Sequence, residues 1–140
     1  MNAVLKPLKR SLVFFMIPDF TMVAFATAIE PLRIANRMLG HEAYRWRLAS
    51  VDGRPVAASN GVVCGVDTSL DDERRKLAGP ERPSMVVVCS GLDVERYQNR
   101  AVFGWLREEY NRGVAIGGLC TGAHVLAAAG LLSNRRCAIH

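Results

Sequence analysis

The sequence has few lysines and no dense run of positive charge. Lysines and arginines number 18 against 13 aspartates and glutamates, which gives a formal net charge of +5. Only Lys6, Lys9 and Lys76 are lysines, and the arginines are scattered along the chain. A nucleic-acid-binding face normally gathers its cations in one patch or stripe. We therefore interpret these charges as a solvated surface and expect little sequence-specific DNA binding by these residues alone.

Patterns typical of disulfide frameworks and metal sites are missing as well. The four cysteines form no C-x-x-C pair, and no histidine stands at a zinc-site spacing from any of them. We therefore expect no metal and no other cofactor. Three of the cysteines, Cys64, Cys89 and Cys137, lie in or beside predicted strands, where a free cysteine behaves as a small core residue.

The N-terminus lacks a convincing export signal. Residues 11–17 (SLVFFMI) follow a basic start, but Pro18 and Asp19 end the apolar run and no small-residue cleavage site follows. The run has the composition of a strand buried on both faces of a parallel sheet. We therefore expect a cytoplasmic protein with reduced thiols.

Charge is also absent from residues 114–132 (VAIGGLCTGAHVLAAAGLL), a run almost as long as a membrane-spanning helix of ~20 residues. The pair Gly117-Gly118 would disrupt a single helix near its start, and the chain has no second hydrophobic span. A strand, a sharp turn and an alanine-rich helix ending at Gly130 fit the run better. We expect no membrane association.

Strand-like and helix-like segments alternate along the rest of the chain. Apolar runs predict buried strands, and alternating large and charged residues predict a less buried one. The predicted strands fall at residues 11–17, 44–51, 84–89 and 114–118, with short strands around the Asn60-Gly61 turn. A further strand is predicted to begin at Arg135 and to reach His140, the last residue.

Helices are predicted between the strands. Residues 21–39 have helical spacing, and Pro31 inside them predicts a kink or a break. Residues 99–112 form a helix that places Val102, Trp105, Leu106 and Tyr110 on one face. The polar residues 71–83 are predicted to be a loop with one helical turn.

This alternation predicts an α/β fold, a three-layer sandwich with a mostly parallel, flavodoxin-like sheet and helices on both faces. The chain stops just after the start of a predicted strand, with no closing helix behind it. We therefore expect a fold truncated at its C-terminus, either as a fragment of a longer protein or as a naturally short one.

The turn from Gly118 to Gly122 has the pattern G-x-C-x-G, with Cys120 at its centre. This is the cysteine form of the nucleophile elbow, a strained strand-to-helix turn that presents a nucleophile above the sheet. A helix N-terminus favours the thiolate over the thiol, and the N–H of Thr121 could point at a developing oxyanion. The alternative is a buried core cysteine in a tight turn.

Several segments together resemble a known family. Residues 117–132 and 135–140, with 17–37 (IPDFTMVAFATAIEPLRIANR) and 86–93 (VVVCSGLD), resemble the ThiJ/PfpI branch of the class I glutamine amidotransferase-like superfamily. They are more similar still to the N-terminal domain of GlxA-type AraC-family transcriptional regulators. The resemblance implies an amidotransferase-like sensor domain over residues 1–140 and a homodimer. It also implies a helix-turn-helix DNA-binding domain beyond residue 140.

The resemblance also assigns site residues. It makes Cys120 the elbow nucleophile and His140, at the end of the next strand, its partner, although His140 could equally be a frayed chain end. Gly91, in the turn after residues 86–89, would offer a second backbone N–H to an oxyanion pocket beside Thr121.

Two further residues are weaker candidates for ligand binding. His124 lies four positions after Cys120, so both could share one helix face, but a packed or capped histidine is an equal alternative. Asp19 follows the carboxyl end of the first strand, where α/β folds bind ligands.

One feature departs from the superfamily's enzymes, which place a carboxylate on the first helix close to the cysteine. By alignment this position falls near Ala24, where no acid stands, and Glu30 lies almost two turns further on. Without a nearby acid, proton transfer to or from a substrate loses its obvious agent. This favours a pocket kept for binding over an active enzyme.

Three functions therefore compete. The leading hypothesis is the effector-binding domain of a transcriptional regulator, which senses a small metabolite near Cys120. The second is a cysteine-dependent amidase, hydrolase or hydratase that uses Cys120 with His140. The third is a redox sensor, because an elbow thiolate oxidises readily.

The resemblance to regulators of quaternary-amine catabolism suggests betaine- or carnitine-like effectors. Aromatic side chains could cage such a cation. The candidates for this cage are Phe20, Phe25, Trp46 and Trp105.

Overall fold

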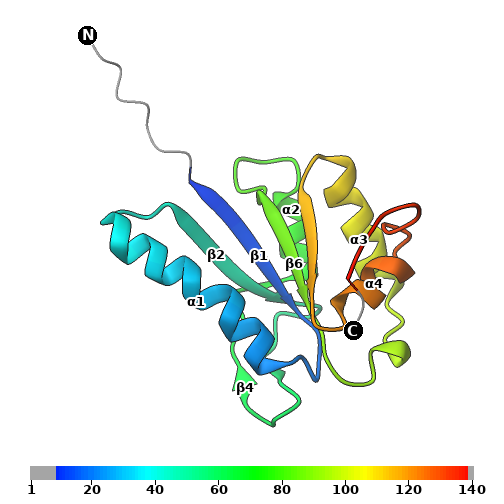
Figure 1. Cartoon of the computed structure of the whole chain (residues 1–140). Helices are drawn as coiled ribbons and strands as arrows, with labels where there is room; N and C mark the ends of the chain where they lie inside the picture. The colour runs from blue at the N-terminus through cyan, green and yellow to red at the C-terminus, as the bar shows by residue number, and fades with distance from the viewer. Residues whose placement is uncertain (1–8, 139–140) are drawn as a thin grey trace.

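The computed structural model describes residues 9–138 and has a five-stranded sheet at its centre (Figure 1). The strands lie in the order β5-β2-β1-β6-β7, and every neighbouring pair is parallel. They are β1 (Arg10–Met16), β2 (Tyr44–Ser50), β5 (Thr68–Ser69), β6 (Met85–Cys89) and β7 (Ala115–Leu119). The predicted parallel sheet is confirmed.

Outside this sheet lies a short antiparallel pair. Its strands are β3 (Val56–Ala57) and β4 (Val63–Cys64), which flank the Asn60-Gly61 turn as predicted. Phe20, just after β1, bridges to Ala58 beside this pair, so the pair is attached near the carboxyl end of β1.

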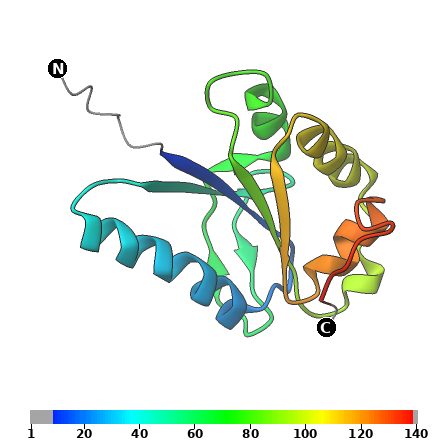
Figure 2. The ribbon, with the colours of Figure 1, turned by 45° about the horizontal axis from the view of Figure 1, so that its top comes forward.

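Helices cover both faces of the sheet, which makes the predicted three layers (Figures 1 and 2). One face carries α1 (Met22–Leu39), and the other carries α2 (Leu70–Lys76), α3 (Arg100–Asn111) and α4 (Gly122–Ala128). A short 3-10 helix, η1 (Val94–Arg96), follows β6. No helix within residues 9–138 is both long and apolar enough to cross a membrane.

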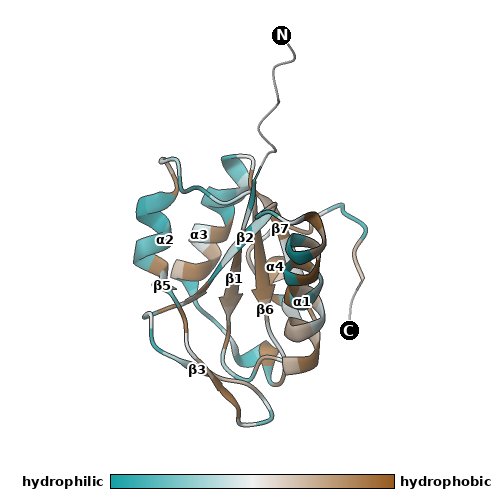
Figure 3. Ribbon diagram, turned by 90° about the vertical axis from the view of Figure 1, so that its left-hand side faces the viewer, coloured by the Kyte–Doolittle hydropathy of each residue, from teal (hydrophilic) through white to brown (hydrophobic). Residues whose placement is uncertain are grey.

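The central strand β1 contributes side chains to the hydrophobic cores on both faces of the sheet. Val13 and Phe15 point into the core beneath α3 and α4, whereas Phe14 and Met16 point into the core beneath α1. All four side chains are at most 1% exposed. The hydrophobic colouring of β1 and β6 in Figure 3 follows from this burial on both faces, as the continuous apolar run predicted.

The predicted break at Pro31 does not occur, because α1 is one continuous helix of 18 residues. Proline removes the N–H that would bond the carbonyl of Thr27. Both residues are exposed, so water can satisfy that carbonyl. The Thr27 hydroxyl also donates to the carbonyls of Val23 and Ala24, one turn back.

The strand predicted to begin at Arg135 is also wrong within the described residues, where 135–138 have no regular structure. Arg135 donates a hydrogen bond to the Tyr110 hydroxyl and places its guanidinium 5.3 Å from the centre of that ring. This contact holds the segment against α3. Cys137 is exposed there, whereas Cys89 is buried and Cys64 is half-buried, so the core placement of Cys137 is corrected.

Two helices differ from their sequence expectations. The predicted loop contains α2, whose N-terminus has a capping box in which Ser69 and Asp72 exchange hydrogen bonds. In α3, Tyr110 is exposed and Glu109 is buried instead. The indole of Trp105 makes this possible, because it lies one turn earlier and donates to the Glu109 carboxyl group.

Candidate functional site

The turn around Cys120 has the geometry of a nucleophile elbow. Cys120 joins β7 to α4 with φ of +54°, a left-handed conformation that costs a residue with a side chain. The flanking glycines are required by close contacts. A Cβ on Gly118 would lie 2.7 Å from the carbonyl carbon of Gly122, and one on Gly122 would lie 2.6 Å from the Val88 oxygen. The half-buried thiol therefore sits on a backbone that the sheet holds in place.

The thiol accepts a hydrogen bond from the start of α1. Thr21 Oγ1 donates a hydrogen bond of 3.3 Å to Cys120 Sγ. Thr21 occupies the N-cap position of α1 but makes no capping bond with its side chain, so its hydroxyl is available to the sulfur. The residue that contacts the cysteine from the start of α1 is thus Thr21, which carries a neutral hydroxyl. The alignment of the superfamily's carboxylate position with Ala24 stays a prediction.

Gly91 lies where two loops cross. A Cβ on this residue would lie 2.2 Å from the Asp19 carbonyl oxygen, so only glycine fits. Hydrogen bonds from Thr21 N to Ser90 O and from Leu92 N to Asp19 O lock the crossing. The loop after β1 is therefore attached directly to the loop after β6.

Thr121 connects this crossing to the elbow. Its hydroxyl lies 2.7 Å from the Gly91 carbonyl oxygen and 3.2 Å from Ser90 Oγ. Within residues 9–138, the backbone N–H groups of Gly91 and Thr121 donate to no protein acceptor. Both remain available to a bound oxygen, and their assignment as oxyanion donors stays a prediction.

The remaining candidates from the sequence are exposed or lie outside the described residues. His124 is exposed on the first turn of α4, and its side chain makes no hydrogen bond to the described residues. Asp19 is exposed at the carboxyl end of β1, with φ of +64°. His140 lies outside the described residues, so its pairing with Cys120 also stays a prediction.

Two hollows lie on either side of Pro18 at the carboxyl edge of the sheet. The Tyr97 hollow, of about 300 Å³, is lined by Ile17, Pro18, Asp19, Leu92, Asp93, Val94, Arg96 and Tyr97. The Arg54 hollow, of about 310 Å³, is lined by Met16, Pro18, Ser50, Val51, Asp52, Arg54, Pro55, Val56 and Ala57. The first is lined by the residues that follow Gly91 in the chain, whereas the second lies beside β2 and β3.

The polar side chains of the Tyr97 hollow have no partners among the described residues. Over the described part of the chain, the side chains of Asp19, Asp93 and Arg96 make no hydrogen bond or ion pair. The Tyr97 hydroxyl oxygen is buried and has no partner there either. Burial raises the pKa of Tyr97 to about 12, so this hydroxyl remains a neutral donor.

The Arg54 hollow differs because its charges are paired with each other. Asp52 accepts hydrogen bonds from the Arg54 backbone N–H and from the Ser50 hydroxyl. The Arg54 guanidinium lies 3.9 Å from the same carboxylate. Of the two hollows, the Tyr97 hollow therefore offers more uncommitted polar groups to a ligand.

The aromatic cage expected from the sequence does not form. Phe20 and Trp105 are fully buried, and Phe25 is 8% exposed, so these rings pack in the cores. Phe25 meets Phe20 edge to face at 5.8 Å between ring centres. Trp46 is only half-buried but packs against the core beneath α1. Tyr97, which the sequence reasoning did not single out, is the aromatic residue of the two hollows beside Pro18.

These features define a class, a flavodoxin-like α/β protein with a cysteine on a strand-to-helix elbow. Residues 10–140 match the DJ-1/PfpI family. The chain belongs to the DJ-1/PfpI family, as the ThiJ/PfpI resemblance of its elbow indicated.

Its curated relatives include regulators of transcription. The chain is 39% identical over 127 residues to the HTH-type transcriptional regulator CdhR of Pseudomonas aeruginosa, covering 91% of this chain and 35% of CdhR. It is 36% identical over 131 residues to the regulator GbdR of the same species, covering 94% of this chain and 34% of GbdR. The chain thus spans about a third of the length of these relatives.

Solved structures share the fold. An AraC family transcriptional regulator from Pseudomonas putida superposes with a TM-score of 0.78 and 28% identity, covering 94% of this chain and 66% of that one. A DJ-1 superfamily protein from Agrobacterium tumefaciens gives a TM-score of 0.68 and 25% identity, covering 89% and 61%. Family members therefore include both regulator domains and proteins described only by their superfamily.

Proposed function

We propose that this chain is the effector-binding domain of an AraC-type transcriptional regulator, and that it binds a small metabolite without converting it. The contact between Thr21 and Cys120 carries this proposal. A neutral hydroxyl beside the thiol can orient it but cannot serve as the carboxylic acid or carboxylate of a proton-transfer cycle. The similarity to CdhR and GbdR supports a regulatory role.

In the complete regulator, we expect DNA to be bound by a separate helix-turn-helix domain beyond residue 140. The isolated chain should then show no tight, sequence-selective binding in a gel-shift assay. We also expect a cytoplasmic protein that forms a homodimer. Sedimentation of the full-length regulator would test the dimer.

We further propose that the effector is a quaternary amine, such as betaine or carnitine, bound in the Tyr97 hollow. Asp19 and Asp93 supply two carboxylates for the ammonium head. Leu92, which is 64% exposed, offers apolar surface to the methyl groups. The Arg96 guanidinium can pair with the ligand's carboxylate.

Calorimetry and thermal unfolding with glycine betaine, carnitine and choline test this proposal. Binding should raise Tm, and the rise should grow with the logarithm of the ligand concentration above Kd. Asp93→Asn should weaken affinity at least tenfold. Asp52→Asn is the matched control, because Asp52 lines the neighbouring Arg54 hollow. If none of the three compounds moves Tm, a quaternary-amine effector is wrong. If both variants bind the ligand like the wild type, the proposal that the ligand occupies the Tyr97 hollow is wrong.

The left-handed backbone at Cys120 favours a second candidate, a cysteine-dependent amidase, hydrolase or hydratase. Such strain is typical of nucleophile elbows in enzymes. Turnover of small amides, lost in Cys120→Ser, would establish this alternative. A ligand-dependent rise in Tm without turnover across the amide panel would favour the binding domain.

A further inference from the structure

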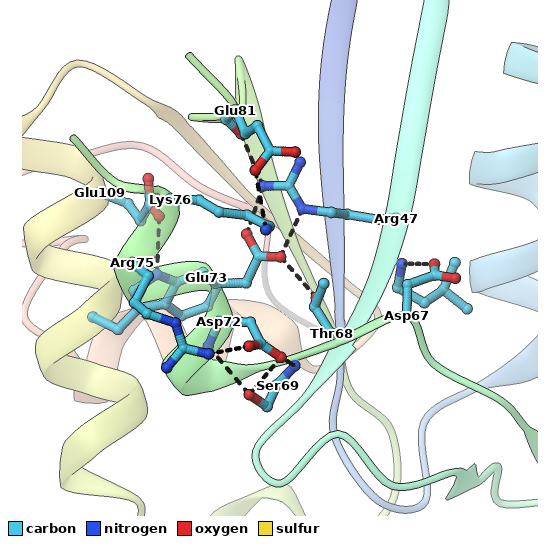
Figure 4. Close-up of polar contacts among 12 residues, drawn as sticks. Arg47, Asp67, Thr68, Ser69, Asp72, Glu73, Arg75, Lys76, Glu81 and Glu109 are labelled. Carbon is cyan, nitrogen blue, oxygen red and sulfur yellow. Dashed lines mark hydrogen bonds and ion pairs between the residues drawn. The ribbon is translucent and has the colours of Figure 1, made fainter. Parts of the chain in front are cut away.

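Away from the elbow, charged side chains are buried between β2, α2 and α3 (Figure 4). Two of them are carboxyl groups with no exposure to solvent, Glu73 on α2 and Glu109 on α3. Burying an ionised carboxylate is costly unless it is paired and hydrogen-bonded. The two groups differ sharply in the partners that the fold provides.

Both carboxylate oxygens of Glu73 have hydrogen-bond partners. Arg47 holds it with two bonds of 2.6 Å, from Nε to Oε1 and from Nη2 to Oε2. The Thr68 hydroxyl donates to Oε1 as well, at 2.7 Å. This bidentate pairing is suited to a negative charge on Glu73.

The carboxyl group of Glu109 has a hydrogen-bond partner on only one of its two oxygens. Its Oε1 accepts a bond of 2.9 Å from Trp105 Nε1. Its Oε2 is buried and has no partner in the described chain. Arg47 is the nearby cation from β2, but its guanidinium is already committed to Glu73 and to the Glu81 carbonyl.

The neighbouring charges act on Glu109 in both directions. Burial raises the pKa of Glu109, and the bond from Trp105 lowers it. The negative charge of Glu73 raises it further, whereas Arg47 and Arg82 lower it. The result is a pKa of about 7, against an ordinary value of 4.5.

We propose that Glu109 is a proton-binding site, and that release of its proton weakens the packing of α3 against α2. The protonated carboxyl group is neutral and needs no cation. The deprotonated group would place a second negative charge beside Glu73 in a space that water does not reach. The helix end affected is next to β7, because the Glu109 carbonyl accepts the N–H of Val114.

The consequence for stability has a definite sign. Between pH 4.5 and about 7 the folded protein holds a proton on Glu109 that the unfolded chain has released. Stability from this group is therefore complete below pH 4.5 and falls as the pH rises to about 7. Above that range the contribution stays lost.

Carbon-13 NMR of the glutamate carboxyl carbons measures the site in the unmodified protein. One resonance, identified by its absence in Glu109→Gln, should titrate with a midpoint near 7 (the value expected from burial). Titration of that resonance between pH 4 and 5, as for an exposed glutamate, would overturn the proposal.

Unfolding measured between pH 4.5 and 8 separates a proton site from a merely structural residue. Glu109→Gln keeps a neutral side chain at every pH, and so it should lose this part of the wild-type pH dependence, up to about 300-fold in the unfolding constant. Glu108→Gln is the matched control, because Glu108 is the exposed neighbour on the same helix and lies 3.7 Å from Arg74. If Glu109→Gln keeps the wild-type dependence, Glu109 is not the proton site.

Discussion

Thr21 and Cys120, which are 99 positions apart in the chain, meet through a hydrogen bond of 3.3 Å from the Thr21 hydroxyl to the sulfur. This bond joins the start of α1 to the elbow after β7. It places a neutral donor where a catalytic cysteine would need an acid or a base. The contact is therefore the place to test how the protein sets the reactivity of the thiol.

Thr21→Val should slow the alkylation of Cys120 by iodoacetamide, by about 3- to 10-fold at neutral pH. The valine cannot donate to the sulfur, and a typical hydrogen bond contributes about 0.5–1.5 kcal/mol net, which matches a change of this size. Mass spectrometry of the modified peptides measures the rate at each cysteine. Cys137, which is exposed and distant in sequence, provides the internal control. Equal rates at Cys120 in both proteins would mean that the bond does not affect the reactivity of the sulfur.

Glycine at position 120 should give a more stable protein than alanine, by about 1 kcal/mol. Glycine adopts the φ of +54° without steric cost, whereas alanine keeps the strain of the native cysteine. Urea unfolding of Cys120→Gly and Cys120→Ala compares the two directly. A more stable alanine variant would show that the elbow relaxes when the thiol is removed.

Gly91→Ala should lower the free energy of unfolding by about 3 kcal/mol. The new Cβ would lie 2.2 Å from the Asp19 carbonyl oxygen, and the backbone would have to move apart at the loop crossing. Gly65→Ala is the control, because a Cβ on Gly65 meets no atom within 4 Å. Similar stability of the two variants would contradict a tight crossing.

Removing the cation beside Glu73 should be costly. Arg47→Met leaves a buried carboxylate without its partner, which destabilises a protein by about 3–5 kcal/mol. Arg45→Met removes an exposed arginine from the same strand and should change stability by less than about 1 kcal/mol. Chemical denaturation of both variants tests the difference. Adding Glu73→Leu to Arg47→Met should recover much of the loss, because no unpaired charge then remains.

The sheet and the elbow could be predicted from the sequence because their signals are local. Continuous apolar runs marked β1 and β6, and the glycines on both sides of Cys120 marked the turn. The continuity of α1 through Pro31 could not be predicted, because it depends on which side of the helix is exposed. A proline frees the carbonyl four residues back and crowds it, and the sequence does not show that Thr27 faces water.

Contacts between distant segments account for the other differences. Thr21 was missed because its role depends on a residue 99 positions away, and alignment placed the neighbouring position at Ala24. The segment after Arg135 reads as a strand, but Arg135 binds Tyr110 on α3. Burial of Glu109 was missed because a carboxyl group on a helix normally faces water. The periodicity of the sequence does not show that the Trp105 indole donates a buried hydrogen bond to this carboxyl group.

The alternation of β1 between the two cores has a consequence for how the domain can change. Val13 and Phe15 serve one helical layer, and Phe14 and Met16 serve the other. A single inserted or deleted residue in this strand would send each side chain to the opposite layer and damage both at once. Sequence change in β1 is therefore restricted to substitutions that both layers can accommodate.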